Sequence, residues 1–487
     1  MKGPLFNVRS SKKTNRDNLG IDNVFSSITG TLCPVINTVT PSPFYWCFLT
    51  WAYYDAHENA KILLKDTKTY DTYVRRQEYF IVLANVLYGG NDLSLLNATD
   101  NIKRYISDDK TSYDYDDDYY GKSGGMYYYV AGLYSMKLFK DNDQDSRYYP
   151  HITKTGEKLA LLFESKIKDT TYYKEYRLGT GSVPKDVLIE YAKSINSMLK
   201  GFDECKSIIK ESLFYSEKHK FLFQSSQYLN YIHNKVHNLN NVKSDDVRRI
   251  LYDEFSYYNK NKYSYPKDLD EVIVGWEVAV GRQYFTMGIE IIWKQILDVL
   301  NANILTLDEW LDKIFEYQNI HEILEKTVSE IIDESIFTFV ERENNLEEIR
   351  KSKYSLVNDN IVFGIQLMLE VYHRFYNRDD CNCEMIQDFF DKESTNLSLN
   401  HWFNDVNRYM DKTLKELLVY VIKEYCINQH IRTARNKMYY GRDGFYIEMI
   451  DNYYRLVEHH SVYFKGNRVM NLITVMKVLD MLGENYE

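Results

Sequence analysis

The sequence predicts a mainly α-helical protein: a multi-helical bundle with an embedded winged-helix-like module and little β-structure. Apolar residues recur at i, i+3 and i+4 along most of the chain from residue 184 onward. Proline is rare, at 7 of 487 residues, and glycine is modest at 21, so few residues break helices. Strand-like alternation of apolar and polar residues is scarce. Together these observations favour helices throughout the chain.

Composition limits the class of protein further. Hydrophobic residues make up 44% and charged residues 27%, which is typical of a globular chain, and 487 residues suffice for about three domains. The formal net charge of −10 argues against a protein whose whole surface coats nucleic acid, although a local basic face could still bind it. The six scattered cysteines do not form a disulfide scaffold, so a reducing cytoplasm is expected.

The first strong element is an aromatic helix near the front of the chain. Ser42 can cap it and Pro43 suits its first position, and we expect the helix to run from about residue 44 to 65. Its apolar residues lie on several faces, so we expect it to be buried in the core or in a subunit interface. A second helix is expected over 69–88, where paired glycines end it.

Neither long apolar passage is suited to crossing a membrane. A spanning helix needs roughly 20 apolar residues with few charges. The run over 44–54 is 11 residues long and charged residues follow at once, whereas 284–300 contains Glu290, Lys294 and Asp298. The basic N-terminal segment lacks the apolar core of a secretory signal. We therefore expect a cytoplasmic protein without membrane contact.

The next stretch predicts the winged-helix-like module. Residues 108–125 are acidic and end in glycine, and we expect an exposed, mobile loop there. A helix over 126–139, a polar turn over 141–152 and a second helix over 153–167, with Thr153 as its cap, follow in that order. A helix, a hairpin-like segment and another helix in this order are typical of many winged-helix modules.

The remainder of the chain is expected to be helical almost throughout, with a small β element over 439–464, where turn residues and β-formers mix. The expected helices cover 184–200, 203–215, 218–238, 244–258, 267–301, 306–317, 319–342, 357–376, 383–392, 398–430 and 466–482. The predicted organisation has five consecutive parts: an N-terminal helical region (1–107), the acidic loop and winged-helix-like module (108–167), a central helical region (168–302), a second helical region (303–430) and a small C-terminal module (431–487).

No metal or cofactor motif emerges from the sequence. One acidic run has Ser146 and Ile152 where a calcium loop needs its glycine and its glutamate. Cys381 and Cys383 make one cluster of ligands, whereas zinc sites usually show two. The glycine-containing loop at 179–186 lacks the spacing that cradles a phosphate. We therefore expect a protein that uses no metal and no cofactor.

Basic residues of the winged-helix-like module are the candidates for contact with nucleic acid. The second helix carries Lys154 and Lys158, and Lys137 and Arg147 are nearby in the sequence. Such residues can contact the phosphates of double-stranded DNA while a helix lies in a groove. They are few and an acidic loop precedes them, so a protein partner is favoured over DNA at this module.

Two further pairs of residues raise other hypotheses. Arg455 and His460, with four residues between them, are similar to the Arg-x4-His pair of a helical nucleotide-binding ribonuclease superfamily, in which the pair acts on the scissile phosphate. Arg282 and Glu290 lie among apolar residues of the long helix over 267–301. We expect a buried ion pair there that holds helices in register, and contact with an effector or partner is the alternative.

Several passages together resemble an uncharacterised family of bacterial helical proteins that is often expected in gene clusters that defend against phage. The similar passages are NLGIDNVFSSITGTLCPVINTVTPSPFYWCFLTW (18–51), GGMYYYVAGLYSMKLF with ITKTGEKLALLFESKI (124–167), WEVAVGRQYFTMGIEIIW (276–293), and HIRTARNKMYYGRDGF with NRVMNLITVMKVLDMLG (430–445 and 467–483). The family brings no established catalytic residues to carry over. The resemblance implies a cytosolic subunit of a multi-protein defence system.

The leading hypothesis is therefore a non-catalytic scaffold, adaptor or sensor subunit. It would bind protein subunits encoded nearby, with double-stranded DNA as a second kind of partner. The alternative is a helical RNA-cleaving effector that acts through Arg455 and His460. The two hypotheses differ in whether RNA cleavage needs His460.

Overall fold

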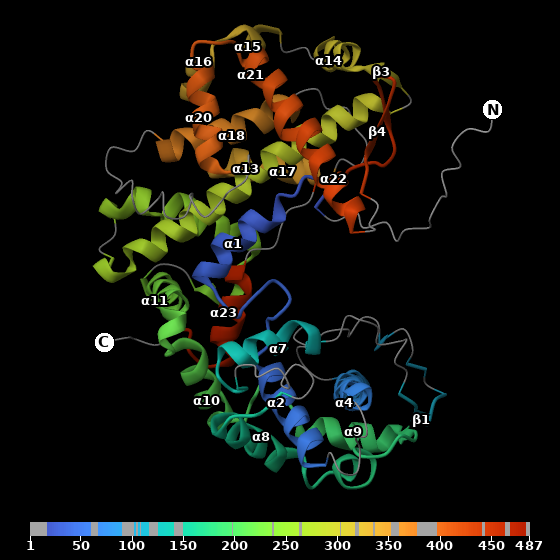
Figure 1. Cartoon of the computed structure of the whole chain (residues 1–487). Coiled ribbons are helices and arrows are strands. Elements are labelled where there is room, and N and C mark those ends of the chain that lie inside the picture. The colour runs from blue at the N-terminus through green and yellow to red at the C-terminus, as the bar shows by residue number, and fades with distance from the viewer. Residues whose placement is uncertain are drawn as a thin grey trace, which may run out of the picture. The chain divides into compact units, whose positions relative to one another are not determined.

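The structure is a computed structural model of the chain, and helices dominate it (Figure 1). It describes residues 17–59, 67–89, 102–103, 106–107, 109–115, 125–140, 150–196, 198–235, 238–262, 265–301, 303–316, 321–334, 337–351, 360–376, 397–440, 444–462 and 468–483. The described strands form one two-stranded and one three-stranded sheet, so the predicted mainly α fold class is confirmed. Within these ranges, every helix is too short or too polar to cross a membrane.

Contacts divide the chain into two compact units, each of which joins segments that are distant in sequence. Unit 1 comprises Met1–Thr29 and Asp245–Lys465, and unit 2 comprises Gly30–Ser244 and Gly466–Glu487. The first boundary falls inside α1 (Asp22–Leu32). The five consecutive parts expected from the sequence stay a prediction. That each unit would contain one end of the chain was not foreseen.

Unit 2 is built around α2, which packs against α4, α7, α8 and α10 (Figure 1). Its helices are α2 (Pro43–Glu58), α4 (Thr67–Tyr88), α7 (Gly125–Ser135), α8 (Lys154–Ile167), α9 (Lys185–Ser194), α10 (Asp203–Phe214), α11 (Lys220–Lys235) and α23 (Arg468–Val478). A π-helix covers Tyr172–Tyr176, and β1 (Ser112–Tyr113) pairs antiparallel with β2 (Val183–Pro184).

Helix α2 begins at Pro43, where the sequence predicts it. The expected cap is wrong, because the Ser42 side chain makes no capping hydrogen bond; the Ser42 backbone N–H donates to the Tyr129 hydroxyl at 2.9 Å instead. The helix is buried on nearly every side, as its apolar pattern predicts. It ends at Glu58, and residues 60–66, where we expected it to continue, lie outside the described ranges.

Helices α7 and α8 are the two helices of the expected winged-helix-like module. Thr153 caps α8 as predicted, because its hydroxyl accepts a 3.1 Å hydrogen bond from a backbone N–H of the first turn. Between the two helices, an isolated antiparallel bridge joins Phe139 to Ile152. Residues 141–149, and 116–124 of the acidic loop, lie outside the described ranges. The winged-helix-like module therefore stays a prediction.

Unit 1 is built around the 31-residue helix α13 (Asp270–Leu300), which is buried over nearly its whole length. The other helices are α12 (Ser244–Arg248), α14 (Leu307–Glu316), α15 (His321–Glu325), α16 (Val328–Glu334), α17 (Phe339–Lys351), α18 (Asn360–Tyr376), α20 (Leu399–Tyr409), α21 (Leu414–Val421) and α22 (Gln429–Tyr439). Two π-helices cover Arg249–Glu254 and Ile422–Asn428, and the second of them joins α21 to α22. Helix α13 packs against α18, α14 and both π-helices.

Helices α13 and α18 cross at two glycines. A Cβ atom at Gly288 would lie 2.5 Å from the Gly364 carbonyl oxygen, and a Cβ atom at Gly364 would lie 2.9 Å from the Gly288 carbonyl oxygen. Side chains do not tolerate such distances, so the two backbones can approach this closely only where both residues are glycine. Gly281 makes a similar close contact with the ring of Phe375 on α18.

A small antiparallel sheet lies where the sequence predicts a β element. β4 (Ile447–Ile450) and β5 (Tyr453–Leu456) form a hairpin, and β3 (Ile304–Thr306) pairs with the other side of β5. The hairpin turn contains Asp451 and Asn452, whose positive φ angles of 48° and 68° are typical of a type I′ turn. The sheet packs on α13 through β5 and on α14 through β3.

Two helices that the sequence predicts as continuous are interrupted. The helix expected over 398–430 breaks before α21, because Thr413 and Glu416 form a reciprocal capping box that starts a new helix. The helix expected over 319–342 is divided among α15, α16 and the start of α17. An antiparallel bridge between Thr327 and Thr413 joins the two breaks. Local capping thus overrides the continuous apolar pattern at both places.

Replacing Gly288 by alanine tests the close crossing of α13 and α18. The added methyl group would clash with the Gly364 carbonyl, and overpacking of this kind costs roughly 1–3 kcal/mol, against roughly 1 kcal/mol that alanine gains over glycine within a helix. We expect Gly288→Ala to lower the midpoint of urea unfolding. Gly30→Ala is the matched control, since its Cβ would meet only the flexible Arg468 side chain at 3.5 Å. Equal effects of the two changes would contradict the crossing.

Candidate functional site

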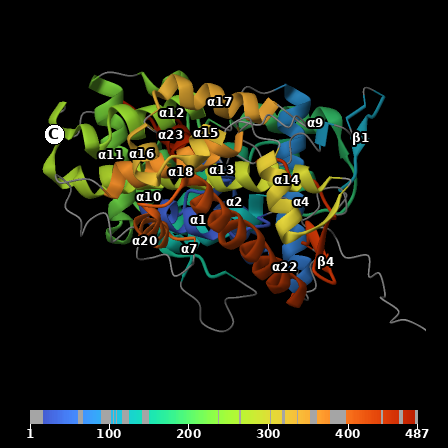
Figure 2. The ribbon, with the colours of Figure 1, turned by 90° about the horizontal axis from the view of Figure 1, so that it is seen from above.

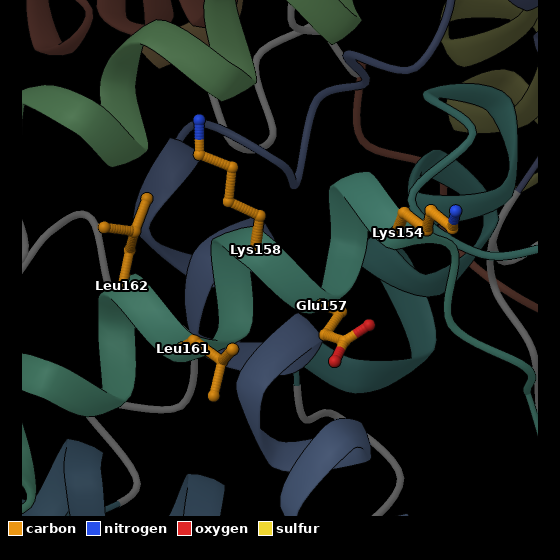
Figure 3. Close-up of a pocket in the computed structure, with 5 residues that line it drawn as sticks. All are labelled: Lys154, Glu157, Lys158, Leu161 and Leu162. Atoms are coloured by element: carbon orange, nitrogen blue, oxygen red, sulfur yellow. The ribbon is translucent and has the colours of Figure 1, made fainter.

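The outer face of α8 carries a shallow hollow of about 340 Å³. Figure 3 shows the residues that line it, which project from successive turns of this one helix: Lys154, Glu157, Lys158, Leu161 and Leu162. All of them are exposed except Leu162, which is half-buried. The hollow therefore offers two ammonium groups, one carboxylate and two aliphatic side chains to a partner.

Helical spacing sets the two faces of α8. Leu159, Phe163 and Ile167 recur at i, i+4 and i+8 and are buried in unit 2. The Phe163 ring lies 5.8 Å, between ring centroids, from each of the rings of Phe44 and Trp51 on α2. Because aromatic packing fixes this inner face, the opposite face presents its side chains from a firmly held helix.

The structure brings three of the four predicted nucleic-acid-binding residues to α8 and its N-terminus. Lys154 and Lys158 lie on the helix itself. Lys137 lies beside its first turn, where the Lys137 carbonyl oxygen accepts a 2.8 Å hydrogen bond from the Thr153 hydroxyl. Arg147 lies outside the described residues. Of these residues, Lys154 and Lys158 line the hollow together with Glu157, whereas Lys137 does not.

Arg455 and His460 lie in two different surroundings. Arg455 belongs to β5, where its guanidinium donates to Glu448 of β4 at 2.6 Å, and both side chains are exposed. His460 follows the sheet and is half-buried, with its ring nitrogens turned inward, and the Asn18 amide donates to its Nδ1 at 3.0 Å. The Arg-x4-His pattern thus spans a strand and the segment after it, whereas in the ribonuclease superfamily the pair lies at a helix end.

His460 shares its partner Asn18 with a second histidine, His430. The Asn18 carbonyl oxygen accepts from Nδ1 of His430 at 3.1 Å, and Nε2 of His430 accepts the Tyr446 backbone N–H at 3.0 Å. Burial is the main reason that the pKa falls to about 4 for His430 and to about 3 for His460, and the charge of Lys294 lowers the second pKa further. Both imidazoles are therefore neutral at pH 7 and act as hydrogen-bonding groups of the core.

Arg282 and Glu290 are both buried in α13, with 0% and 6% of their surface exposed. Eight residues along one helix correspond to a rise of about 12 Å, which favours a separate partner for each side chain. The Arg282 guanidinium donates to the Leu397 carbonyl oxygen and lies 4.8 Å from the centre of the Phe285 ring. Arg282 thus ties α13 to the segment that precedes α20.

A buried ionic network that sequence reasoning missed lies beside α13. Arg342 of α17 binds Glu370 of α18 at 2.5 Å and also binds Asp253 of the π-helix Arg249–Glu254. Arg248 and Glu343 form another pair at 2.5 Å. Burial raises the pKa of Glu370 to about 7, although the neighbouring arginines lower it. These charges link four elements of unit 1: α12, the π-helix Arg249–Glu254, α17 and α18.

Arg374 of α18 joins the same region to α13. Its guanidinium donates to Glu277 at 2.8 Å and to Ser256 at 3.0 Å, and its carbon atom lies 3.7 Å from the centre of the Tyr252 ring. Glu277 is fully buried, so its charge depends on such partners. The sequence signal for the network was a charged residue on an apolar face, such as Glu277, which indicates that a partner exists but not which one.

The described residues contain no group of three or more His, Cys, Asp or Glu side chains that could hold a metal ion. Cys381 and Cys383, considered above, lie outside the described ranges. The fold and its surfaces define a class: a mainly α-helical protein with two units, charged groups enclosed in one core, and an open face of mixed charge on α8. Comparisons of the chain with protein-family models, with curated proteins and with solved structures found no match.

Removing the Arg374 guanidinium tests whether the buried network stabilises unit 1. Arg374→Met takes a counter-charge from the buried Glu277 carboxylate, and breaking a buried pair in this way costs roughly 3–5 kcal/mol. We expect a corresponding loss in the free energy of unfolding, measured in urea. The double variant Arg374→Met with Glu277→Gln should lose less, because no buried charge is then left. A double variant as unstable as the sum of the two single variants would show that the pair is not coupled.

The histidine cluster predicts a loss of stability in acid. Folded-state pKa values below the ordinary 6.5 mean that the unfolded chain binds more protons. The stability contributed by His430 and His460 is therefore present above pH 6.5 and is lost as the pH falls toward 4 and 3. For His430 the lowered pKa corresponds to roughly 3 kcal/mol. We expect the free energy of unfolding to fall between pH 6.5 and pH 4.

Variants isolate the histidines from other titrating groups. Glu370 acts in the opposite direction, because its raised pKa gives stability that is present below pH 4.5 and lost as the pH rises through about 7. His430→Gln should therefore reduce the acid-induced loss, and His57→Gln, at an exposed histidine, is the control substitution. The same pH dependence in wild type and His430→Gln would show that His430 does not titrate as described.

Proposed function

We propose that this chain is a non-catalytic scaffold, adaptor or sensor subunit that binds a partner protein on the outer face of α8. The mixed hollow on that face is the observation that supports the proposal best. Lys154 and Lys158 suit carboxylates of a partner, Glu157 suits a cationic group, and the two leucines suit an apolar side chain. A charged rim around apolar contacts is typical of protein–protein interfaces.

The inner face of α8 supports the same proposal. Phe163 packs among the α2 rings, so the outer residues start from a backbone that binding need not reorder. A surface on a rigid helix loses less conformational entropy on binding than a loop does. This is the property that a scaffold or adaptor needs.

Double-stranded DNA is the second kind of partner that we propose for Lys137, Lys154 and Lys158. The net charge of −10 and the presence of Glu157 within the hollow favour a protein over a phosphate backbone. A mobility shift with duplex DNA at low salt separates the two, because phosphate contacts are strongest there. No shift at low salt would exclude duplex DNA as a partner, and the proposal of a protein partner would remain.

The biological setting rests on the resemblance alone. We propose that the chain is a cytoplasmic subunit of a bacterial multi-protein system that defends against phage, and that its partners are encoded nearby. The RNA-cleaving alternative gains no support from the positions of Arg455 and His460. Arg455 is exposed in a sheet, whereas the His460 ring accepts a hydrogen bond from the Asn18 amide. His460→Ala is expected to destabilise the fold and not to abolish a cleavage reaction selectively.

Reversing the charge of the α8 face tests the proposed docking. The tagged chain is co-expressed with its neighbouring genes and purified, and we expect a stoichiometric partner to copurify. Lys154→Glu with Lys158→Glu should weaken that complex at least tenfold, roughly 1.4 kcal/mol, because the two new carboxylates repel the partner carboxylates that the lysines bound. Leu161→Asp should weaken it as well. Binding is measured by titration of the purified partner.

A matched control keeps the change in net charge equal. Lys193→Glu with Lys220→Glu reverses two exposed lysines elsewhere in unit 2 and should leave the complex intact. Circular dichroism and thermal unfolding should be the same for wild type and both double variants. A chain that elutes alone, or a complex that tolerates the α8 reversals, would overturn the proposal.

A further inference from the structure

Helix α22 carries a basic and aromatic face that the proposed docking on α8 does not use. From Gln429 to Tyr440 the sequence has three basic residues besides His430 and no acidic one, although the whole chain has a net charge of −10. Arg432 and Arg435 are exposed, whereas His430 and Ala434 face the core. Charge is thus concentrated locally on a helix face that points to solvent.

Two tyrosines extend this face at the end of the helix. Tyr439 and Tyr440 are the most exposed of the large apolar side chains in the described ranges, at 85% and 76%. Arg432, Arg435 and Tyr439 stand at i, i+3 and i+7, so they share one side of α22. The two tyrosine rings lie edge to face, with centroids 5.3 Å apart and planes at 90°.

The stability of the helix does not account for this pattern. Cations favour a helix C-terminus only within about its last turn. Lys437 is the basic residue in the last turn of α22, and its ammonium group also donates to the Asp17 carbonyl oxygen at 2.5 Å. Arg432 lies further back, in a helix that continues from α21 through the second π-helix. Exposed aromatic rings beside two arginines therefore point to a ligand.

We propose that the face formed by Arg432, Arg435, Tyr439 and Tyr440 binds single-stranded nucleic acid. The guanidinium groups suit phosphates and the exposed rings suit unpaired bases, which is the combination that single-strand-binding surfaces use. Seven residues of helix rise about 10 Å, a length close to three stacked nucleotides at about 3.4 Å each. A duplex fits less well, because its paired bases offer no free faces to tyrosine.

The N-terminal half of α22 is fixed, so this face has a defined position in unit 1. His430 binds both Asn18 and the backbone of Tyr446, which leads into β4. Figures 1 and 2 both show α22 beside β4. The aromatic end of the helix is therefore presented from a supported base and needs little reordering when it binds.

Fluorescence anisotropy with short labelled strands tests the proposal on the full chain. The probes are oligo(dT), oligo(rU) and a duplex of equal length, each at several salt concentrations from about 50 to 200 mM. We expect single strands to bind more tightly than the duplex. The two single-strand probes distinguish a preference for DNA from one for RNA, and either preference supports the proposal.

Variants separate the two parts of the face. Tyr439→Ala with Tyr440→Ala should weaken binding by at least about fivefold, since stacking on an aromatic ring contributes roughly 5- to 150-fold per base. Arg432→Gln with Arg435→Gln should reduce the slope of log K against log salt by about 1.4, because two phosphate contacts on a single strand are lost.

Matched controls connect the effect to α22. Tyr88→Ala with Tyr215→Ala removes two other exposed tyrosines and should leave strand binding unchanged. Lys154→Glu with Lys158→Glu, the α8 reversals, should also leave it unchanged, so failure of the docking on α8 and failure of this proposal are distinguishable. No binding of single strands at about 50 mM salt, tighter binding of the duplex by the chain that carries the α8 reversals, or full binding by the tyrosine variant would overturn the inference.

Discussion

Helix α13 has almost no exposed side, and this constrains everything packed around it in unit 1. A charged side chain on such a helix must be paired or hydrogen-bonded, because an isolated buried charge is strongly unfavourable. Neighbouring segments supply Arg374 for Glu277 and the Leu397 carbonyl for Arg282, whereas α13 itself supplies Asp298 for Lys294 at 2.6 Å. The buried helix therefore selects which residues α18 and the segment before α20 bring to it.

The glycine crossing makes this pairing possible. With Gly288 against Gly364, α18 lies so close to α13 that Arg374 can reach Glu277, while Glu370 on α18 remains available to Arg342. In unit 2, α2 has the same central position but is filled mainly by aromatic rings. Since both central helices are enclosed, the surfaces left for partners are on outer helices such as α8 and α22.

The sequence predicts the helices better than it predicts their contacts. Pro43, the Thr153 cap and the turn residues of the β hairpin act locally, so the chain near each of them is enough to place an element. The pairs Arg342–Glu370 and Arg374–Glu277 join residues 28 and 97 positions apart, and no local sequence pattern predicts such pairings. Local capping by Thr413 also ends a helix that the apolar pattern alone would continue.

The candidate site was predictable in the same partial way. Lys154 and Lys158 could be assigned to one exposed helix face from their spacing, whereas His460 is hydrogen-bonded to Asn18, 442 positions away. The exposed end of α22 was missed because its tyrosines are frequent residues in this chain, 45 in all, and their exposure is visible only in the fold.

Native-state hydrogen exchange tests most directly whether the two enclosed helices are the structural centres. The backbone amides of α13 in unit 1 and of α2 in unit 2 should exchange last, with protection that approaches the free energy of global unfolding. The amides near the exposed end of α22 should exchange much sooner. Exchange in α13 and α2 as fast as at that exposed end would contradict the account.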